Sequence, residues 1–280
     1  MLNTNQSLNI DTHTMDVQEL TTEFEKFKGQ LKSYILRMTA SATDAEDLLQ
    51  DTYLKAHDKL DTFRGESTLK TWVFAIASNL ARDLLKSKKR WPENVTDICR
   101  EEALNEPSMF AKSMFIRNNS PQGNFEIKEH IAFCFTCVSK SLPLEQHLCV
   151  LLKEVYDFSL KEVATILKVS EQMVKYYLHT GRTKMIEVFD GRCALINQEG
   201  ICHQCTEING IFNPKQNTQE ELVKIKMYRE AQKGDKQHLF DLRMQVVAGI
   251  DPFESGAAEL QLHHLEFNRK TMEKYLKKND

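Results

Sequence analysis

The stretch FSLKEVATILKVSEQMVKYYLHTGRTKM, residues 158–185, has the pattern of two short helices joined by a tight turn. Ser159 and Glu162 fit a capping box that would open the first helix, and Ser170 can cap the second. Small Ala164 stands where the two helices would cross closely. Apolar residues fit the remaining template, at Val163, Leu167, Val169, Val174 and Leu178. The pattern predicts a helix-turn-helix, with Lys168 where the turn usually has glycine.

The outward face of the second helix would carry side chains able to contact phosphates and base edges in a DNA major groove. These are Gln172, Lys175, Tyr176, His179 and Arg182. Gly181 is expected to end or bend this helix, because glycine inside a helix costs about 1 kcal/mol relative to alanine. The competing interpretation is a pair of packed surface helices with ordinary solvated charges.

The segment before residue 91 also favours helices. Apolar residues recur three and four apart over 17–38, over 44–60 and from 67 to a basic run that ends at Arg90. Asp44 and Ser67 are the candidate caps of the second and third of these helices. The glycine of FRGES, residues 63–67, interrupts the pattern between them. We expect three helices in this part of the chain.

Between 92 and 125 the periodicity decays, and three prolines occur, which is typical of a linker. Helical spacing returns around 126–141 and 144–156, and again within 218–280 on both sides of a turn at Asp251 and Pro252. We therefore expect an all-α fold, with two helical domains joined by a linker and a small Cys-containing helical extension.

Composition limits the classes of protein that fit. The chain has 280 residues, a formal net charge of -3 and 7 cysteines. No basic segment followed by an apolar run opens it, and no stretch approaches the roughly 20 apolar residues of a membrane helix. We expect a cytoplasmic protein without a membrane partner. A charge this close to zero argues against indiscriminate coating of nucleic acid, so any DNA contact must be local.

Two segments resemble conserved regions of one family. Residues 24–90, including DAEDLLQDTYLKAHDKLDTFRGESTLKTWVFAIASNLARDLLKSKKR at 44–90, resemble the second region of bacterial sigma factors of the extracytoplasmic-function group, within the sigma-70 family. Residues 128–189 look like the fourth region of that group, with a linker in place of the third. The resemblance implies an initiation factor that binds core RNA polymerase, recognises two elements of promoter DNA and assists melting, with no catalysis of its own.

The resemblance also implies roles for three sets of residues. The single-stranded minus-ten element would be held by the loop Phe63, Arg64, Gly65, Glu66 and Ser67, and by Asn79, Arg82, Lys86, Lys88, Lys89 and Arg90. The minus-thirty-five element would be contacted by the outward face of the helix-turn-helix named above. Core polymerase would be bound by Asp44, Asp47, Gln50 and Asp51. A flipped base costs a few kcal/mol, which a pocket and nearby cations must offset. For the acidic set, an ordinary solvated face is the competing interpretation.

The expected organisation follows from these assignments. It comprises a disordered N-terminus over 1–16, sigma region 2 over 17–91, a linker over 92–125, sigma region 4 over 126–189, a Cys-rich segment over 190–217 and a helical extension over 218–280. We expect residues 191–280 to fold against the sigma core and modulate its access to promoter or polymerase. Whether a separate anti-sigma factor is a further partner stays open.

The cysteines allow three interpretations. Cys193, Cys202, His203 and Cys205 lie close enough in sequence for a zinc site, structural or sensory. The C-x-x-C pair alone could instead sense redox state through a reversible disulfide, and plain buried thiols are the third interpretation. No cofactor is required for the sigma function.

Two other functions compete with an initiation factor. A stand-alone helix-turn-helix regulator with a zinc or redox-sensing module would leave the acidic helix and the FRGES loop unexplained. A thiol oxidoreductase would need the βαβ pattern that usually stands beside C-x-x-C, and the sequence lacks it.

Overall fold

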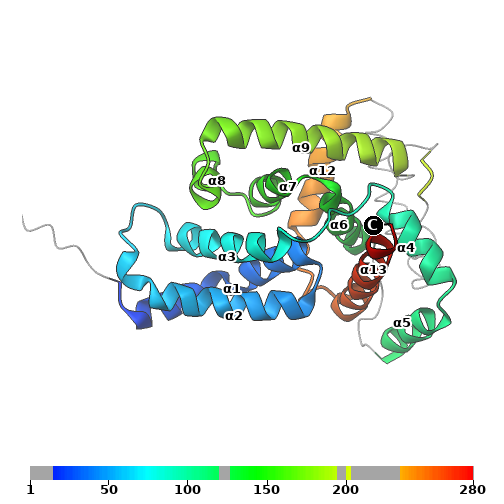
Figure 1. Cartoon of the computed structure of the whole chain (residues 1–280), viewed down its shortest axis with the longest axis horizontal. Helices are drawn as coiled ribbons and strands as arrows, with labels where there is room; N and C mark the ends of the chain where they lie inside the picture. Colours follow the sequence, from blue (N-terminus) through cyan, green and yellow to red (C-terminus); the bar gives the residue numbers. More distant parts are fainter. Residues whose placement is uncertain (1–14, 120–126, 194–199, 203–233, 280) are drawn as a thin grey trace, which may run out of the picture.

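The computed structural model describes residues 15–119, 127–193, 200–202 and 234–279 (Figure 1). These residues form helices, and their one extended pairing is a backbone bridge between Cys193 and Cys202. The all-α expectation is confirmed for this part of the chain. The expected disordered segment 1–16 lies almost entirely outside the described residues.

Three helices, α1 (Val17–Thr39), α2 (Ala42–Asp58) and α3 (Leu69–Leu85), pack side by side into the first unit, with a short 3-10 turn at Leu60–Thr62. The two predicted caps were each placed wrongly. Ser41 caps α2 by accepting the N–H of Asp44, and Thr68 caps α3 by accepting the N–H of Thr71. In each case the capping oxygen stands three residues before the N–H that it satisfies, which is the reach of a short hydroxyl side chain.

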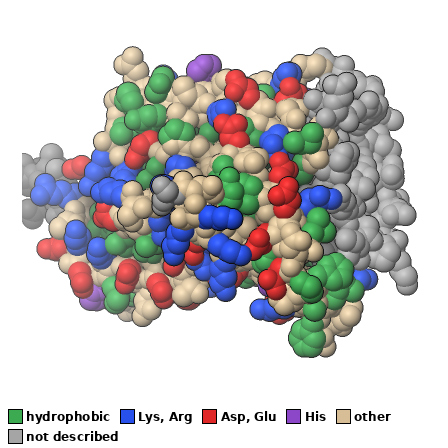
Figure 2. Space-filling model, turned by 45° about the vertical axis from the view of Figure 1, so that its right-hand side comes forward, with side chains coloured by type: hydrophobic (Ala, Val, Ile, Leu, Met, Phe, Trp, Pro, Cys, Tyr) green, Lys and Arg blue, Asp and Glu red, His purple; other side chains and the backbone are tan. Residues whose placement is uncertain are grey.

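The segment predicted as an irregular linker contains two helices, α4 (Val95–Leu104) and α5 (Pro107–Asn119). Pro107 fits the first position of α5, where a helix needs no N–H donor. Both helices bury only a narrow strip, and Leu104 and Phe115 stay 71% and 67% exposed. Figure 2 shows hydrophobic side chains gathered at the lower right, the corner where α5 lies in Figure 1. Periodicity was weak here because so little of each helix is buried.

The second unit consists of α6 (Ile127–Val138), a 3-10 turn at Ser139–Ser141, α7 (Leu144–Val150), a π-helical turn at Leu151–Val155, α8 (Leu160–Leu167) and α9 (Glu171–Arg192). The capping box of Ser159 and Glu162 and the Ser170 cap are confirmed. Lys168 adopts the left-handed conformation that the turn demands, with φ +57°, and its N–H bonds the carbonyl of Ala164. α8 and α9 form the predicted helix-turn-helix.

Gly181 does not end α9, which continues to Arg192, so the expectation of an end there was wrong. The glycine is buried against α7, and a Cβ there would lie 3.0 Å from Cγ2 of Val150. Close packing, not helix termination, explains the residue.

Two helices of the extension pack against the linker helices and the second unit. α12 (Lys236–Ala248) contacts α6, α9 and the π-helical turn, whereas α13 (Ala258–Lys278) contacts α4, α5 and α6 (Figure 1). One continuous hydrophobic cluster runs through the first unit, the second unit and these two helices. The described chain is therefore a single packed body rather than two domains on a loose tether.

Candidate nucleic-acid interface

Helix α3, which carries Asn79 and Arg82, packs against α8 of the second unit. The Arg82 guanidinium donates to a carboxylate oxygen of Glu145 at 3.1 Å and to the Asn79 amide oxygen at 3.2 Å. Only 17% of the Arg82 side chain is exposed. The helix predicted to hold the minus-ten strand is thus covered along this face.

Three further contacts stabilise the same junction. The Thr71 hydroxyl donates to a carboxylate oxygen of Glu162 at 3.1 Å. The rings of Phe74 and Phe158 meet edge to face, 4.9 Å apart, and the Lys70 ammonium stands over the Phe158 ring. Because Glu162 also belongs to the capping box of α8, the first helix of the helix-turn-helix is fastened directly to α3.

The loop before α3 remains accessible. Arg64, Gly65 and Glu66 are exposed, and Gly65 has φ +70°, a conformation that other residues rarely adopt. Phe63 lies against Trp72, with ring centroids 5.3 Å apart, and Ser67 is half-buried. The loop could receive a base, but the helix that follows it is covered.

The basic residues at and after the end of α3 have different surroundings: some are exposed, and one is held inside the fold. Lys86 pairs with Asp83 at 2.8 Å, and both are exposed. The Arg90 guanidinium donates to the Leu142 carbonyl at 2.6 Å and to Nδ1 of His147 at 3.0 Å, and burial lowers the pKa of Arg90 to about 10. Arg90 therefore joins the end of the first unit to the second. Lys88 and Lys89 remain exposed.

The predicted polymerase-binding face is open. Asp47, Gln50 and Asp51 are exposed on α2, and Leu54 on the same face is 50% exposed. Asp44 differs from them, because its carboxylate lies 3.6 Å from the Lys88 ammonium.

The outward face of α9 is also open at four of its five predicted positions. Gln172, Lys175, Tyr176 and His179 are exposed. Arg182 instead pairs with Glu154 at 2.6 Å, bonds Asp241 of α12, and lies over the Phe240 ring. The extension thus occupies one member of the predicted minus-thirty-five set.

Arg37 ties the extension to α1, and sequence reasoning missed it. The side chain is 1% exposed and donates to the carbonyl oxygens of Val247 at 3.1 Å and Ile250 at 2.6 Å. Its position three residues after buried Tyr34 was the available signal, because it places a charge on the apolar face of the helix.

The predicted metal site is only partly visible. Cys193 is buried and its sulfur accepts a hydrogen bond from Arg243 at 3.1 Å, and the Cys202 N–H bonds the Arg192 carbonyl. His203 and Cys205 lie outside the described residues. Within the described part of the chain, no group of three His, Cys, Asp or Glu side chains could hold a metal ion. The zinc and redox interpretations stay predictions.

Comparison with known proteins fits both units. Residues 24–91 match the family model of Sigma-70 region 2, and residues 133–185 match that of Sigma-70, region 4. The ECF RNA polymerase sigma-E factors of Salmonella typhimurium and Escherichia coli are each 28% identical over 142 residues, covering 51% of this chain and 71% of theirs. The chain belongs to the extracytoplasmic-function group of the sigma-70 family. It is an RNA polymerase sigma factor, and a stand-alone regulator is not favoured because region 2 is present.

Three further proteins are also similar to this chain. The RNA polymerase sigma-H factor of Pseudomonas aeruginosa is 24% identical over 143 residues, 51% of this sigma factor and 72% of that protein. Two solved structures have 18% identity: CnrH in complex with the cytosolic domain of CnrY, with a TM-score of 0.43, and RpoE with the anti-sigma factor NepR from Bartonella quintana, with 0.41. They cover 62% of this chain, and 90% and 98% of theirs. Neither family match reaches α12 or α13.

None of the described helices in this sigma factor is both long and apolar enough to cross a membrane.

Proposed function

We propose that this sigma factor rests in a closed state, held by its C-terminal extension, in which the helix that reads the minus-ten element is covered by region 4. The contact of α3 with α7 and α8 carries this proposal. Opening would separate the two units and release Arg82 and Asn79 for the melted strand.

The spacing of promoter elements favours such opening. Elements named minus-ten and minus-thirty-five are separated by about 25 base pairs, which is about 85 Å of duplex at about 3.4 Å per base pair. In the closed state the Thr71 hydroxyl and the Glu162 carboxylate are 3.1 Å apart. A sigma factor with α3 fixed to α8 does not span that length of duplex.

The extension keeps the linker short. Residues 92–126 could reach roughly 115 Å if fully extended, at about 3.3 Å per residue. Residues 95–119, packed as α4 and α5, span far less than their extended length, because a helix rises only about 1.5 Å per residue. Contacts with α13 fix that packing: the Ser113 hydroxyl lies 3.1 Å from Nε2 of His264, and Lys274 pairs with Glu102 at 2.7 Å. Release of α13 would free the linker to lengthen.

The closed state is expected to retain affinity for core polymerase, because the acidic face of α2 is open. Replacing Asp47 and Asp51 together with lysine should weaken binding to core polymerase by about tenfold or more, since the change reverses two charges at the interface. Co-elution of the full chain with purified core measures this. Asp58→Lys, an exposed change at the end of α2, is the control, and unchanged co-elution of the double variant would remove the assignment.

Lys175 is expected to contact a phosphate of the minus-thirty-five element. Lys175→Ala should weaken promoter binding on all sequences alike and reduce the slope of log affinity against log salt by about 1. Titration of a labelled promoter duplex at several salt concentrations measures the slope. Lys161→Ala, an exposed change on α8, serves as control. An unchanged affinity and slope for Lys175→Ala would show that this face does not dock on DNA.

Run-off transcription from genomic promoter fragments with core polymerase tests the closed state. Glu145→Gln keeps the side-chain size but removes the charge that holds Arg82, so transcript yield should rise by about fivefold, a discounted value for a partly exposed ion pair. Glu25→Gln removes an exposed ion pair within α1 and should change nothing. Equal yields from Glu145→Gln and the unaltered chain would contradict closure at this contact.

We assign no catalysis to this chain, because RNA synthesis belongs to the polymerase that it would direct. Work on chromosomal promoters would place it in the cytoplasm.

A further inference from the structure

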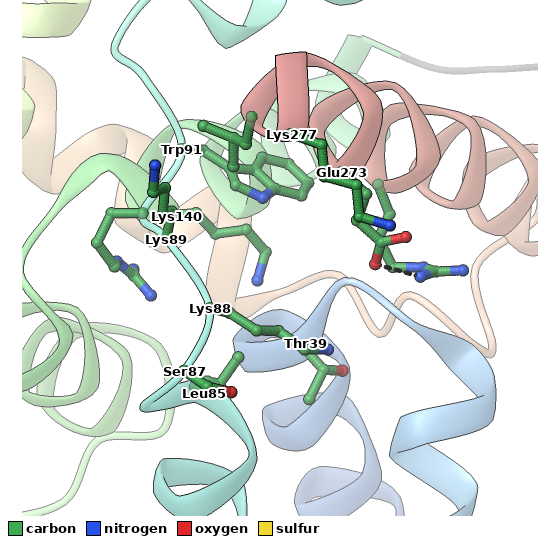
Figure 3. Close-up of a pocket in the computed structure, with 12 residues that line it drawn as sticks. Thr39, Leu85, Ser87, Lys88, Lys89, Trp91, Lys140, Glu273 and Lys277 are labelled. Atoms are coloured by element: carbon green, nitrogen blue, oxygen red, sulfur yellow. Dashed lines mark hydrogen bonds and ion pairs between the residues drawn. The ribbon is translucent and has the colours of Figure 1, made fainter. Parts of the chain in front are cut away.

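A cavity of about 430 Å³ opens where the end of α3, the turn after α6 and the C-terminal end of α13 meet (Figure 3). Ligand pockets in proteins usually measure about 300–1,000 Å³, so this one is large enough for a small molecule. None of the roles assigned above involves a ligand bound in this cavity.

Positive charge dominates its lining. The basic side chains are Lys88, Lys89, Arg90, Lys140, Arg269 and Lys277, whereas among the described residues Glu273 is the one acidic side chain that lines it. Glu273 already pairs with Arg269, 2.6 Å away. Like charges held within a few ångströms repel one another, and an anion among them relieves that repulsion.

Lys140 is the most constrained of these cations. It is 3% exposed, its ammonium donates to the Met38 carbonyl, and it lies 5.3 Å from the centre of the Trp91 ring. An ammonium has three N–H donors, so one carbonyl leaves capacity for an anionic oxygen. Burial, reinforced by the charge of Arg90, holds the pKa of Lys140 well below its usual value, and a bound anion would favour the charged form.

The cations reach the cavity from opposite sides, and an apolar wall lies beside them. Lys88 and Lys89 come from the end of α3, whereas Arg269 and Lys277 come from α13. Leu85, Trp91 and Leu276 supply apolar surface, and Figure 3 shows Trp91 beside α13 at the edge of the same space. Arginine and lysine at several positions suit more than one phosphate group, and an apolar wall suits a ring.

We propose that this cavity binds a small molecule that carries at least two phosphate groups on a ring-bearing body, the chemistry of a nucleoside diphosphate. Such a ligand would bridge region 2 and α13. It would therefore stabilise the packed extension, and its binding does not depend on whether the closed state represses transcription.

Isothermal titration of the full chain with ADP, GDP and inorganic pyrophosphate at low salt tests the proposal. We expect a nucleoside diphosphate to bind with a Kd below about 100 μM, and pyrophosphate more weakly. Lys88→Glu combined with Lys277→Glu should weaken nucleotide binding by about tenfold or more, because two attractive charges become repulsive. Both lysines are exposed, so the variant should fold, and circular dichroism checks this. Lys278→Glu, next to the cavity but not lining it, should leave the affinity unchanged.

Three outcomes would overturn the proposal. The first is no binding of either nucleotide or pyrophosphate up to about 1 mM. The second is equal affinity of the double variant and the unaltered chain, which would place the ligand elsewhere. The third is pyrophosphate binding as tightly as ADP and GDP, which would leave a phosphate site but remove the ring-bearing body. If only single-stranded promoter DNA bound, and the double variant lost it, the cations would belong to the minus-ten contact and the first outcome would apply.

Discussion

Replacing Arg37 with methionine should release the C-terminal extension and raise transcription by this sigma factor by about tenfold. The guanidinium lies at the C-terminal end of α12, where it donates hydrogen bonds to the carbonyl oxygens of Val247 and Ile250. Carbonyl groups at a helix end carry the negative end of the helix dipole, so a cation there stabilises the helix in place. Methionine matches the apolar part of the side chain but donates no hydrogen bond.

The effect should fall mainly on the docked state. A hydrogen bond to a charged group contributes about 1.5–3 kcal/mol, and the carbonyls of Val247 and Ile250 lose their donor only while α12 is docked. A loss of about 2 kcal/mol shifts the docking equilibrium by more than about tenfold. Hydrogen exchange of α12 amides in the full chain should accelerate by a similar factor, and run-off transcription should rise with it.

Lys28→Met is the matched control for this prediction. Lys28 lies on the exposed side of the same helix, and among the described residues it pairs only with Glu25 of that helix, so the change should affect neither measurement. Faster exchange in Arg37→Met without more transcript would show that docking of the extension does not repress. Unchanged exchange would show that Arg37 does not hold α12.

The helix-turn-helix was predictable because its signals are local. The capping box spans four residues, and the apolar positions of α8 and α9 recur within two turns. Such patterns depend on neighbours along the chain, so a window of sequence contains all the information needed. For Lys168 the sequence showed only that the residue differs from the glycine usual at this turn. Its left-handed conformation is imposed by the turn geometry, whatever the residue.

Helices α4 and α5 were missed because their packing partner, α13, is more than 140 residues away at the contacts that follow. The Cys99 thiol lies 3.9 Å from the Asn268 carbonyl, and Ile116 packs with Leu260. Helix α13 is a main packing partner of both helices, and α4 also contacts α6. The prediction that the helix ends at Gly181 was wrong for a related reason, because contact with Val150 outweighs the weak helix propensity of glycine.

The arginines predicted to contact DNA also have partners that are distant in the sequence and could not be predicted from it. Arg82 and Arg90 were placed on DNA by the family resemblance, and Arg182 by the outward face of its helix. Each bonds a group more than 50 residues distant, in Glu145, Leu142 and Asp241 respectively. Their positive charge was readable from the sequence, whereas their partners depended on how the units pack. On α9 the fold leaves Gln172, Lys175, Tyr176 and His179 exposed, as predicted for an outward face, and their contact with DNA stays a prediction.

Acidification from pH 7 to pH 5 should reduce the free energy of unfolding of the full chain by on the order of 4 kcal/mol. Three buried histidines carry this prediction. Burial lowers the pKa of His130 to about 4 and that of His264 to about 3, and it holds the pKa of His147 well below its usual value. In the unfolded chain each would titrate near about 6.5.

The sign follows from where the protons bind. Below about pH 6.5 the histidines of the unfolded chain bind protons, whereas the buried histidines of the folded chain stay neutral. The free energy of unfolding therefore falls as the pH falls, until the folded groups titrate near about pH 4. Each histidine contributes up to about 1.4 kcal/mol per pH unit across this window. Neighbouring cations reinforce the effect: Arg243 acts on His130, and Arg90 and Lys140 act on His147.

The local contacts require neutral rings. Arg90 can only donate, so Nδ1 of His147 must accept and carries no proton. Nε2 of His264 lies 3.1 Å from the Ser113 hydroxyl, where α13 meets the linker. Protonation of these two histidines would therefore loosen the contacts that keep the closed state together.

Urea unfolding of the full chain at several values between pH 7.5 and pH 5 measures the loss. His264→Gln should remove about one third of the pH dependence, because glutamine can bond Ser113 without titrating. His57→Gln, an exposed change on α2, is the matched control. A stability that stays flat to pH 5 and falls only below about pH 4.5 would assign the acid sensitivity to carboxylates such as Glu162 and Glu266, whose pKa values are lowered by their hydrogen-bond partners, and not to the buried histidines.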